Sequence, residues 1–321
     1  MSLQATNADS GARRAPTSSR TSVLVAVLLC INVPAVVAAI EGASFCARHR
    51  SSGFITVDGV RRGYVLRVPA TLDRSRPVPL VISLHGAGLW GGAQRDISGW
   101  NEVADREGFL VAYPSGRGRA SPRVWPAIAG PGLLRDVEFL TRLVDTLVVR
   151  YDADPDRVYV NGLSNGGGMT FALSCAAPHR VAAAGIVGGA LLLPWEGCAA
   201  TSTPLPVIVF HGTEDTAAPY HGGESWVTTL PFPDIPAWVA TWAARNGCAA
   251  SPRDTPNVTR RSYAPCAEGG DVVLYTLHGD GHVWPGGPDV LSRWLVGTDS
   301  RTVHATEVMW EFFRERRRRG G

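Results

Sequence analysis

Apolar runs of strand length recur from residue 79 onward, and helix-like segments separate them. The stretch 79–84 is almost continuously apolar and contains β-branched residues, as in a strand that is buried on both faces. Similar runs lie at 109–113, 158–160, 181–187, 205–210 and 271–277. Strands that alternate with helices along a chain predict an α/β fold, with a mostly parallel sheet and helices on both faces.

Helices are predicted where apolar residues recur at spacings of three and four. The clearest example carries Val137, Leu140, Val144, Leu147 and Val148. Further helices are expected over 100–107, 171–177, 235–246 and 302–316.

Two β-like runs, at 54–57 and 64–68, precede the first buried strand. Asp58-Gly59 between them marks a turn, and we expect a hairpin whose loop is longer than two residues. The stretch 114–132 is rich in Gly, Pro and Arg and is expected to be a loop. Its Trp125 is a candidate for lining a pocket, although packing alone also explains a tryptophan in a loop.

The sequence has no internal repeat and no linker that would separate a second domain. With 321 residues, of which 45% are hydrophobic, the chain is long enough to bury one large core. We therefore expect a single folded domain over 40–321, after an N-terminal segment of a different kind.

The net charge is only +3, and all 31 basic residues are arginines. Much of the positive excess lies at the two ends, including the run Arg316–Arg319, and the middle of the chain is near neutral. This distribution gives no reason to expect nucleic acid as a partner. The terminal arginine run follows the last predicted helix and is expected to be a solvated tail.

The N-terminus has the pattern of a targeting segment. Polar, arginine-bearing residues 1–22 precede an apolar run over 23–40, and small residues at 37–39 suit a signal peptidase. A retained membrane anchor is the less favoured alternative, because Asn32 and Pro34 interrupt a run that is already at the lower length limit for a span. We predict a signal peptide over 1–39, an extracellular protein and no stable membrane association after cleavage.

Five of the six cysteines follow the predicted cleavage site, and no C-x-x-C spacing occurs, so no metal site is expected. In an oxidising compartment, we predict the short-range pairs Cys175–Cys198 and Cys248–Cys266, with Cys46 left over; other pairings stay open. Each pair would close a loop of about 20 residues and stabilise the fold by roughly 3 kcal/mol.

The strand at 158–160 runs into Gly162-Leu163-Ser164-Asn165-Gly166, a G-x-S-x-G pattern followed by a helix-compatible segment. A strand that turns sharply into a helix through this pattern is a nucleophile elbow, and its tight turn requires small residues such as Gly162 and Gly166. Ser164 is the candidate nucleophile, and the backbone N–H of Asn165 is a candidate oxyanion donor. A glycine-rich turn with an exposed serine is the alternative.

The buried strand at 79–84 ends in His85-Gly86-Ala87-Gly88. Backbone N–H groups of a glycine-rich loop at the carboxyl end of a strand can point at an anion, so the 86–88 loop is the candidate source of a second oxyanion donor. Ala87 is the best single candidate. An ordinary strand-to-helix turn is the alternative.

Two other strand ends carry an acid and a base. Asp215 follows the strand at 205–210, and His282 follows the last strand on a loop with Gly279 and Gly281. The order Ser, Asp, His is that of an α/β-hydrolase, in which the histidine takes the serine proton and the acid orients the histidine. The competing acids are Glu214 and Asp280, and the competing histidines are His85, His211, His221 and His278.

Five longer segments carry a family resemblance. They are LHGAG at 84–88, GWNEVADREGFLVAYPSG at 99–116, DADPDRVYVNGLSNGGGMT at 152–170, HGTEDTAAPY at 211–220 and GHVWPGG at 281–287. These segments resemble the secreted esterases that include extracellular polyhydroxybutyrate depolymerases and feruloyl esterases of the carbohydrate esterase family 1 type. The resemblance implies an α/β-hydrolase fold and a triad of Ser164, Asp215 and His282, without a metal or organic cofactor.

The same segments suggest substrate contacts. His85 and Trp284 lie in the first and last of them and are expected to contact the substrate. Depolymerases of this family often have Cys where Ala87 stands, which is a departure at the oxyanion loop. The chain ends soon after its last predicted helix, with no room for the linker and substrate-binding domain of polymer-binding depolymerases. We therefore expect a small or oligomeric ester as the partner.

Together these patterns predict a secreted serine esterase that hydrolyses carboxylic esters through an acyl-enzyme, with polyhydroxyalkanoate oligomers or feruloyl esters as substrates. An acyltransferase or a peptidase with the same triad is the nearest alternative, because the acceptor depends on the shape of the pocket. A non-catalytic secreted binding protein on a hydrolase scaffold is the alternative from a different class.

Overall fold

The computed structural model describes residues 50–118, 123–126, 130–190, 203–255, 258–288 and 296–318. These residues all fall within one unit, His49–Gly321. The predicted signal peptide over 1–39, Cys46 and Cys198 lie outside them, so the signal peptide and the Cys175–Cys198 pair stay predictions. Within the described ranges, no helix combines the length and apolar character that a bilayer span requires.

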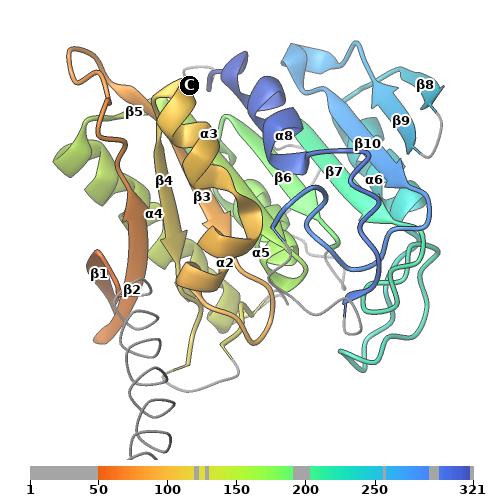
Figure 1. Ribbon diagram of the computed structural model, residues 1–321, viewed down its shortest axis with the longest axis horizontal. Coiled ribbons are helices and arrows are strands. Elements are labelled where there is room, and N and C mark those ends of the chain that lie inside the picture. The colour runs from red at the N-terminus through yellow and green to blue at the C-terminus, as the bar shows by residue number, and fades with distance from the viewer. Residues whose placement is uncertain are drawn as a thin grey trace, which may run out of the picture. The chain divides into compact units, whose positions relative to one another are not determined.

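A ten-stranded sheet forms the centre of the fold, in the order β1-β2-β4-β3-β5-β6-β7-β10-β9-β8 (Figure 1). The strands are β1 (Gly53–Val57), β2 (Val60–Arg67), β3 (Val78–Leu84), β4 (Leu110–Pro114), β5 (Ala153–Leu163), β6 (Ala183–Val187), β7 (Val207–Gly212), β8 (Ala250–Thr255), β9 (Val258–Tyr263) and β10 (Val272–Leu277). The neighbours from β4 across to β10 are parallel, which confirms the predicted mostly parallel sheet. Antiparallel pairs flank them on both sides.

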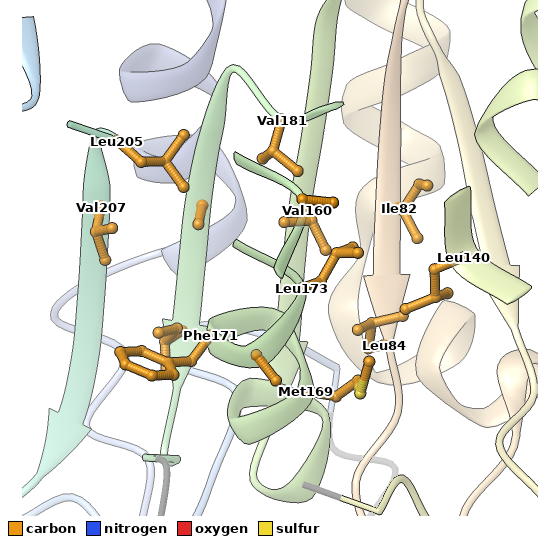
Figure 2. Close-up of a cluster of buried hydrophobic side chains, with 14 of the residues drawn as sticks. Ile82, Leu84, Leu140, Val160, Met169, Phe171, Leu173, Val181, Leu205 and Val207 are labelled. Atoms are coloured by element: carbon orange, nitrogen blue, oxygen red, sulfur yellow. The ribbon is translucent and has the colours of Figure 1, made fainter. Parts of the chain in front are cut away.

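Helices cover both faces of this sheet. They are α2 (Gly91–Ser98), α3 (Trp100–Glu107), α4 (Pro131–Tyr151), α5 (Asn165–Ala176), α6 (Ile235–Arg245) and α8 (Ala305–Arg314). In β3, Ile82 packs in the cluster that contains α4, α5 and α6, whereas Val81 packs in the cluster that contains α3 and α8. This alternation of adjacent side chains is the two-residue period of a strand with both faces covered. Figure 2 shows part of the first cluster, and α3 and α8 lie on the near side of the sheet in Figure 1.

The predicted amphipathic helix is α4, and it begins earlier than the apolar spacing alone indicates. Pro131 occupies its first turn, where the missing N–H costs nothing and the fixed φ favours the helix. The buried stripe includes Leu140, Val144 and Leu147, as expected, whereas Val137 and Val148 are only partly buried. The stripe is therefore rotated toward Phe139 and Leu143, which sequence spacing did not single out.

The first hairpin corrects our expectation of a longer loop. Val57 pairs with Val60, so the loop between β1 and β2 has two residues, Asp58 and Gly59. Their φ values of 48° and 72° are those of a type I′ turn, whose twist suits a two-residue hairpin. The strand prediction began too late, because the arginines at the start of β2 hid its period.

Two elements were not predicted at all. Helix α2 begins with two glycines, and no element was predicted there; the β8–β9 hairpin lies in a stretch with proline and cysteine. The disulfide Cys248–Cys266 was predicted correctly, and it joins the chain just after α6 to the segment after β9. It supports, at this end of the sheet, a hairpin that has few long apolar side chains.

Arg316, Arg317 and Arg318 are ion-paired rather than part of a solvated tail, which corrects the prediction from charge alone; Arg319 lies outside the described residues. Arg316 pairs with Asp271 at 3.2 Å. Arg317 pairs with Asp154 at 3.0 Å, and Arg318 pairs with Asp156 at 2.8 Å. These acids lie next to or within β5 and β10, so the chain after α8 is bound to strands from two parts of the sheet.

Candidate active site

The turn between β5 and α5 has the backbone geometry of a nucleophile elbow. Ser164 connects them with φ 56° and ψ −118°, a conformation that costs a non-glycine residue about 1–3 kcal/mol. Its backbone is held on both sides, because its N–H donates to Val187 O at 2.8 Å and its carbonyl accepts from Gly168 N at 3.0 Å. Strain that the surroundings maintain in this way is typical of a functional position.

Glycines make this turn sterically possible. A Cβ on Gly162 would lie 2.4 Å from the backbone of Gly166, and a Cβ on Gly166 would lie 2.4 Å from the carbonyl oxygen of Leu84. Close contact with main-chain atoms therefore explains why small residues are required on both sides of the serine. The contact also fixes the elbow against the carboxyl end of β3.

We expect Gly166→Ala to destabilise the protein by about 3 kcal/mol or more, because the atoms that the methyl group would strike are main-chain oxygens of a buried strand. Urea unfolding measures this loss. Gly167→Ala is the milder control from the same turn, since its Cβ would lie 3.1 Å from the Ile186 side chain and 3.3 Å from the carbonyl oxygen of Gly162, both farther than the 2.4 Å contact at Gly166. Equal losses for the two variants would contradict this account.

An acid and an imidazole meet at the ends of the neighbouring strands β7 and β10. Nδ1 of His282 lies 2.7 Å from Oδ2 of Asp215, whose side chain is fully buried. The other oxygen, Oδ1, accepts the backbone N–H groups of Ala217 at 2.9 Å and Ala218 at 2.7 Å. With a proton on Nδ1, the imidazole donates to the carboxylate and leaves Nε2 as an acceptor.

The competing acids occupy other places. Glu214 is exposed. Asp280 is buried, and burial raises the pKa of its carboxyl group. Its Oδ1 accepts Ser300 N at 2.8 Å, so it ties the loop that precedes His282 to the segment before α8. This contact gives Asp280 a structural role in the loop.

Ser164 and His282 line one cavity of about 490 Å³. The structure thus brings together the three side chains that the sequence placed at separate strand ends. Two glycines after β6 permit this approach and were missed. A Cβ on Gly188 would lie 3.2 Å from His282 Nδ1, and one on Gly189 would lie 2.4 Å from Ser164 O. The Gly-Gly pair after a strand of small residues was the available signal.

The loop after β3 lies beside the elbow, as predicted, but only part of it is available to bind an anion. The N–H of Gly88 donates to Arg123 O at 2.8 Å, which removes that group from the predicted donors. The N–H of Ala87 has no acceptor within the described ranges. The N–H of Asn165 belongs to the first turn of α5, where helices lack internal acceptors. Both residues line the cavity.

His85 and Trp284 are structural in this arrangement, which corrects their predicted role as substrate contacts. His85 is fully buried; its Nε2 accepts Gly116 N at 2.8 Å, and its Nδ1 lies 2.7 Å from Gly86 O. Trp284 is 4% exposed, and its indole N–H donates to Thr306 Oγ1 at 2.8 Å. Neither is among the described residues that line the cavity. A motif places a residue near a site without saying which way its side chain points.

Burial lowers the pKa of His85 to about 4, from about 6.5 in an unfolded chain. The unfolded state therefore binds a proton first as the pH falls. This residue should contribute stability that is fully present above pH 6.5 and falls by about 3 kcal/mol by pH 4. Urea unfolding across this range measures it. His85→Gln keeps a donor and an acceptor but does not titrate, so its stability should fall less steeply; parallel curves would contradict the prediction.

His211 supports the acid from behind. It is fully buried, its Nε2 lies 2.7 Å from Ala218 O and 3.5 Å from Asp215 Oδ2, and burial lowers the pKa of its ring. A neutral ring in this position donates to Ala218 O and holds the loop that carries Asp215. The sequence offered His211 as a competing triad histidine, and in the structure it supports the loop that carries the acid.

The cavity is largely apolar. Its described lining contains no carboxylate and no arginine, and His282 is its only histidine. The outer wall includes Trp226, which is 63% exposed, and Val227. They lie on a loop closed by Gly223 and Phe232, which exchange two backbone hydrogen bonds of 3.0 and 2.8 Å. Within the described ranges, no group of three His, Cys, Asp or Glu side chains is placed to hold a metal ion.

Comparison with known proteins gives a consistent result. The family model "Esterase PHB depolymerase" matches residues 62–203. "Putative esterase NocK" of Nocardia uniformis subsp. tsuyamanensis is 31% identical over 285 residues, which cover 80% of each chain. "Feruloyl esterase B" of Piromyces equi is 29% identical over 238 residues, which cover 69% of this chain and 42% of that longer protein.

Solved structures support the fold independently. An acetyl xylan esterase from Aspergillus awamori superposes with a TM-score of 0.53 at 20% sequence identity. The superposition covers 69% of this chain and 89% of that one. With the sheet order and helix layers described above, this likeness confirms the predicted α/β-hydrolase fold.

Proposed function

Since the chain belongs to the esterase PHB depolymerase family and is a hydrolase of carboxylic esters, we propose that it acts as a secreted serine esterase through an acyl-enzyme. One observation carries the proposal. His282, which is hydrogen-bonded to Asp215, and the strained Ser164 line a single cavity. The disulfide Cys248–Cys266 supports an oxidising, extracellular location.

The first half-reaction forms the acyl-enzyme. Ser164 Oγ attacks the ester carbonyl carbon while Nε2 of His282 takes the hydroxyl proton. The N–H groups of Ala87 and Asn165 stabilise the oxygen that becomes negative. Asp215, with both oxygens already engaged, stabilises the imidazolium. When the tetrahedral intermediate collapses, His282 returns the proton to the leaving alkoxide.

The second half-reaction uses the same groups with water as the nucleophile. His282 takes a proton from water as the water oxygen attacks the acyl carbon. It then gives this proton to Ser164 Oγ as the acid leaves. No metal or organic cofactor takes part in these steps.

The lining of the cavity favours an uncharged ester with an apolar or aromatic group. Leu89 and Phe232 offer apolar surface, and Trp226 presents an exposed ring at the edge. The described lining offers no charged partner for a terminal carboxylate or for an ammonium group. Feruloyl esters and short, neutral hydroxyalkanoate oligomers satisfy this chemistry, and both are expected to be substrates.

Covalent labelling tests the proposal. A fluorophosphonate should label the wild-type protein, and peptide mapping should place the adduct on Ser164. The same preparation is then given a p-nitrophenyl ester, methyl ferulate, a hydroxybutyrate oligomer and a peptide, with and without an alcohol acceptor. Ester hydrolysis with labelling supports the esterase. Predominant acyl transfer or peptide cleavage would replace it, and absent labelling with no turnover would favour a binding protein.

A further inference from the structure

The two proposed oxyanion donors come from loops that are far apart in the chain. Ala87 follows β3, and Asn165 begins α5. Donors in such a hole must lie about 2.7–3.1 Å from the developing oxyanion, so their relative position has to be fixed closely. The described segment 123–126 is bonded to both loops.

The side chain of Asn165 binds this segment on the elbow side. Its Oδ1 accepts the backbone N–H of Trp125 at 2.7 Å, and its Nδ2 donates to the carbonyl oxygen of the same residue at 2.8 Å. The amide therefore pairs with Trp125 as a strand neighbour would, through one donor and one acceptor. A carboxylate or a hydroxyl of similar size cannot present both groups in this geometry.

The same segment binds the other loop on both sides of Ala87. The indole N–H of Trp125 donates to His85 O at 3.0 Å, and Arg123 O accepts Gly88 N–H at 2.8 Å. Trp125 is 1% exposed, so these contacts are shielded from water. The backbone around Ala87 is consequently held to the residue that Asn165 holds.

The segment is itself anchored to the sheet. Val124 and Arg117 exchange backbone hydrogen bonds of 3.1 and 3.3 Å. The guanidinium of Arg62 is centred 5.2 Å from the Trp125 ring, is paired with the buried Asp136, and donates to Ser115 O. The connection between the two loops thus rests on a segment that is also held by contacts outside both of them.

We propose that the Asn165 side chain and Trp125 are positioning residues that set the separation of the two oxyanion donors. The inference rests on the proposed function, because it assigns a purpose to donors that act only in ester hydrolysis. It assigns Asn165 two separate roles: its main chain binds the oxyanion, and its side chain places that main chain.

Asn165→Ala tests this inference, because the variant keeps the backbone N–H and loses only the side-chain amide. We expect kcat to fall about 10- to 100-fold, with KM changed by less than about twofold. A trifluoromethyl ketone provides the second measurement. Ser164 Oγ forms a bond to the carbonyl carbon of this ketone, the π electrons of the carbonyl move to its oxygen, and His282 takes the hydroxyl proton of Ser164. The inhibition constant of the ketone should rise by the same factor as kcat falls.

Asn101→Ala is the matched control, since it removes an asparagine side chain bonded to Tyr113 at 2.9 Å, outside the described cavity lining. Its activity should equal that of the wild type. If Asn165→Ala does not fold, Trp125→Phe removes the indole donor and keeps a ring, and it should weaken kcat and the inhibitor together. Unchanged kcat and inhibitor affinity, or a loss confined to KM, would overturn the inference. A wild type without labelling or turnover would instead reject the proposed function and the inference with it.

Discussion

Ser164→Ala is expected to lower kcat for a p-nitrophenyl ester by about 10⁴- to 10⁶-fold. The variant lacks the hydroxyl oxygen that forms the acyl-enzyme. Water that attacks the ester directly cannot form this covalent intermediate. Substrate should still bind, because the described apolar lining of the cavity is unchanged. Burst-phase kinetics and steady-state rates on the same preparation provide the measurement, and fluorophosphonate labelling should disappear in parallel.

Folding provides the control for this prediction. Alanine at this position has to adopt the same φ of 56°, so the strain is retained and the thermal midpoint should stay close to that of the wild type. A folded Ser164→Ala protein with more than about 1% of the original kcat would show that another group is the nucleophile.

Asp215→Asn is expected to lower kcat by about 10⁴-fold, mainly through the tautomer of the neighbouring imidazole. Oδ1 of Asp215 accepts two backbone N–H groups, so the asparagine oxygen will take that place. Its NH₂ group then faces Nδ1 of His282, which must become an acceptor and carry its proton on Nε2. An Nε2–H cannot take the proton of Ser164.

The nearby Glu214→Gln variant is the matched control, since it also removes one carboxylate but at an exposed position. We expect its kcat to be unchanged. The kcat of Asp215→Asn should recover partly at high pH if hydroxide replaces the lost base. Equal activity of the two variants would remove Asp215 from the proposed triad.

The parts of the fold that sequence predicted are those with a strong local cause. The almost wholly apolar composition of β3 predicts that the strand is buried on both faces, as it is. The G-x-S-x-G turn requires glycines because main-chain atoms lie too close for a side chain. The places of Ser164, Asp215 and His282 followed from where the predicted strands end along the chain. Their convergence at one edge of the sheet depends on parallel pairing, which alternation of strands and helices predicts.

The incorrect predictions concern side-chain direction and distant partners. His85 belongs to the predicted segment 84–88, but its ring is turned into the protein toward Gly116, a contact that no local pattern encodes. Likewise, the charge of Arg316–Arg318 does not show that acids from β5 and from the start of β10 lie nearby. Both outcomes depend on residues that only the folded sheet brings together.

Trp226 gives the protein an intrinsic optical reporter of occupancy. It is the tryptophan with an exposed ring among those that the structure describes, and it lies at the wall of the cavity. An indole in water emits at longer wavelength than a buried one and is open to collisional quenching by acrylamide. A molecule seated against this wall would shield it, so ligand titrations on an inactive variant can be followed by emission without attaching a dye.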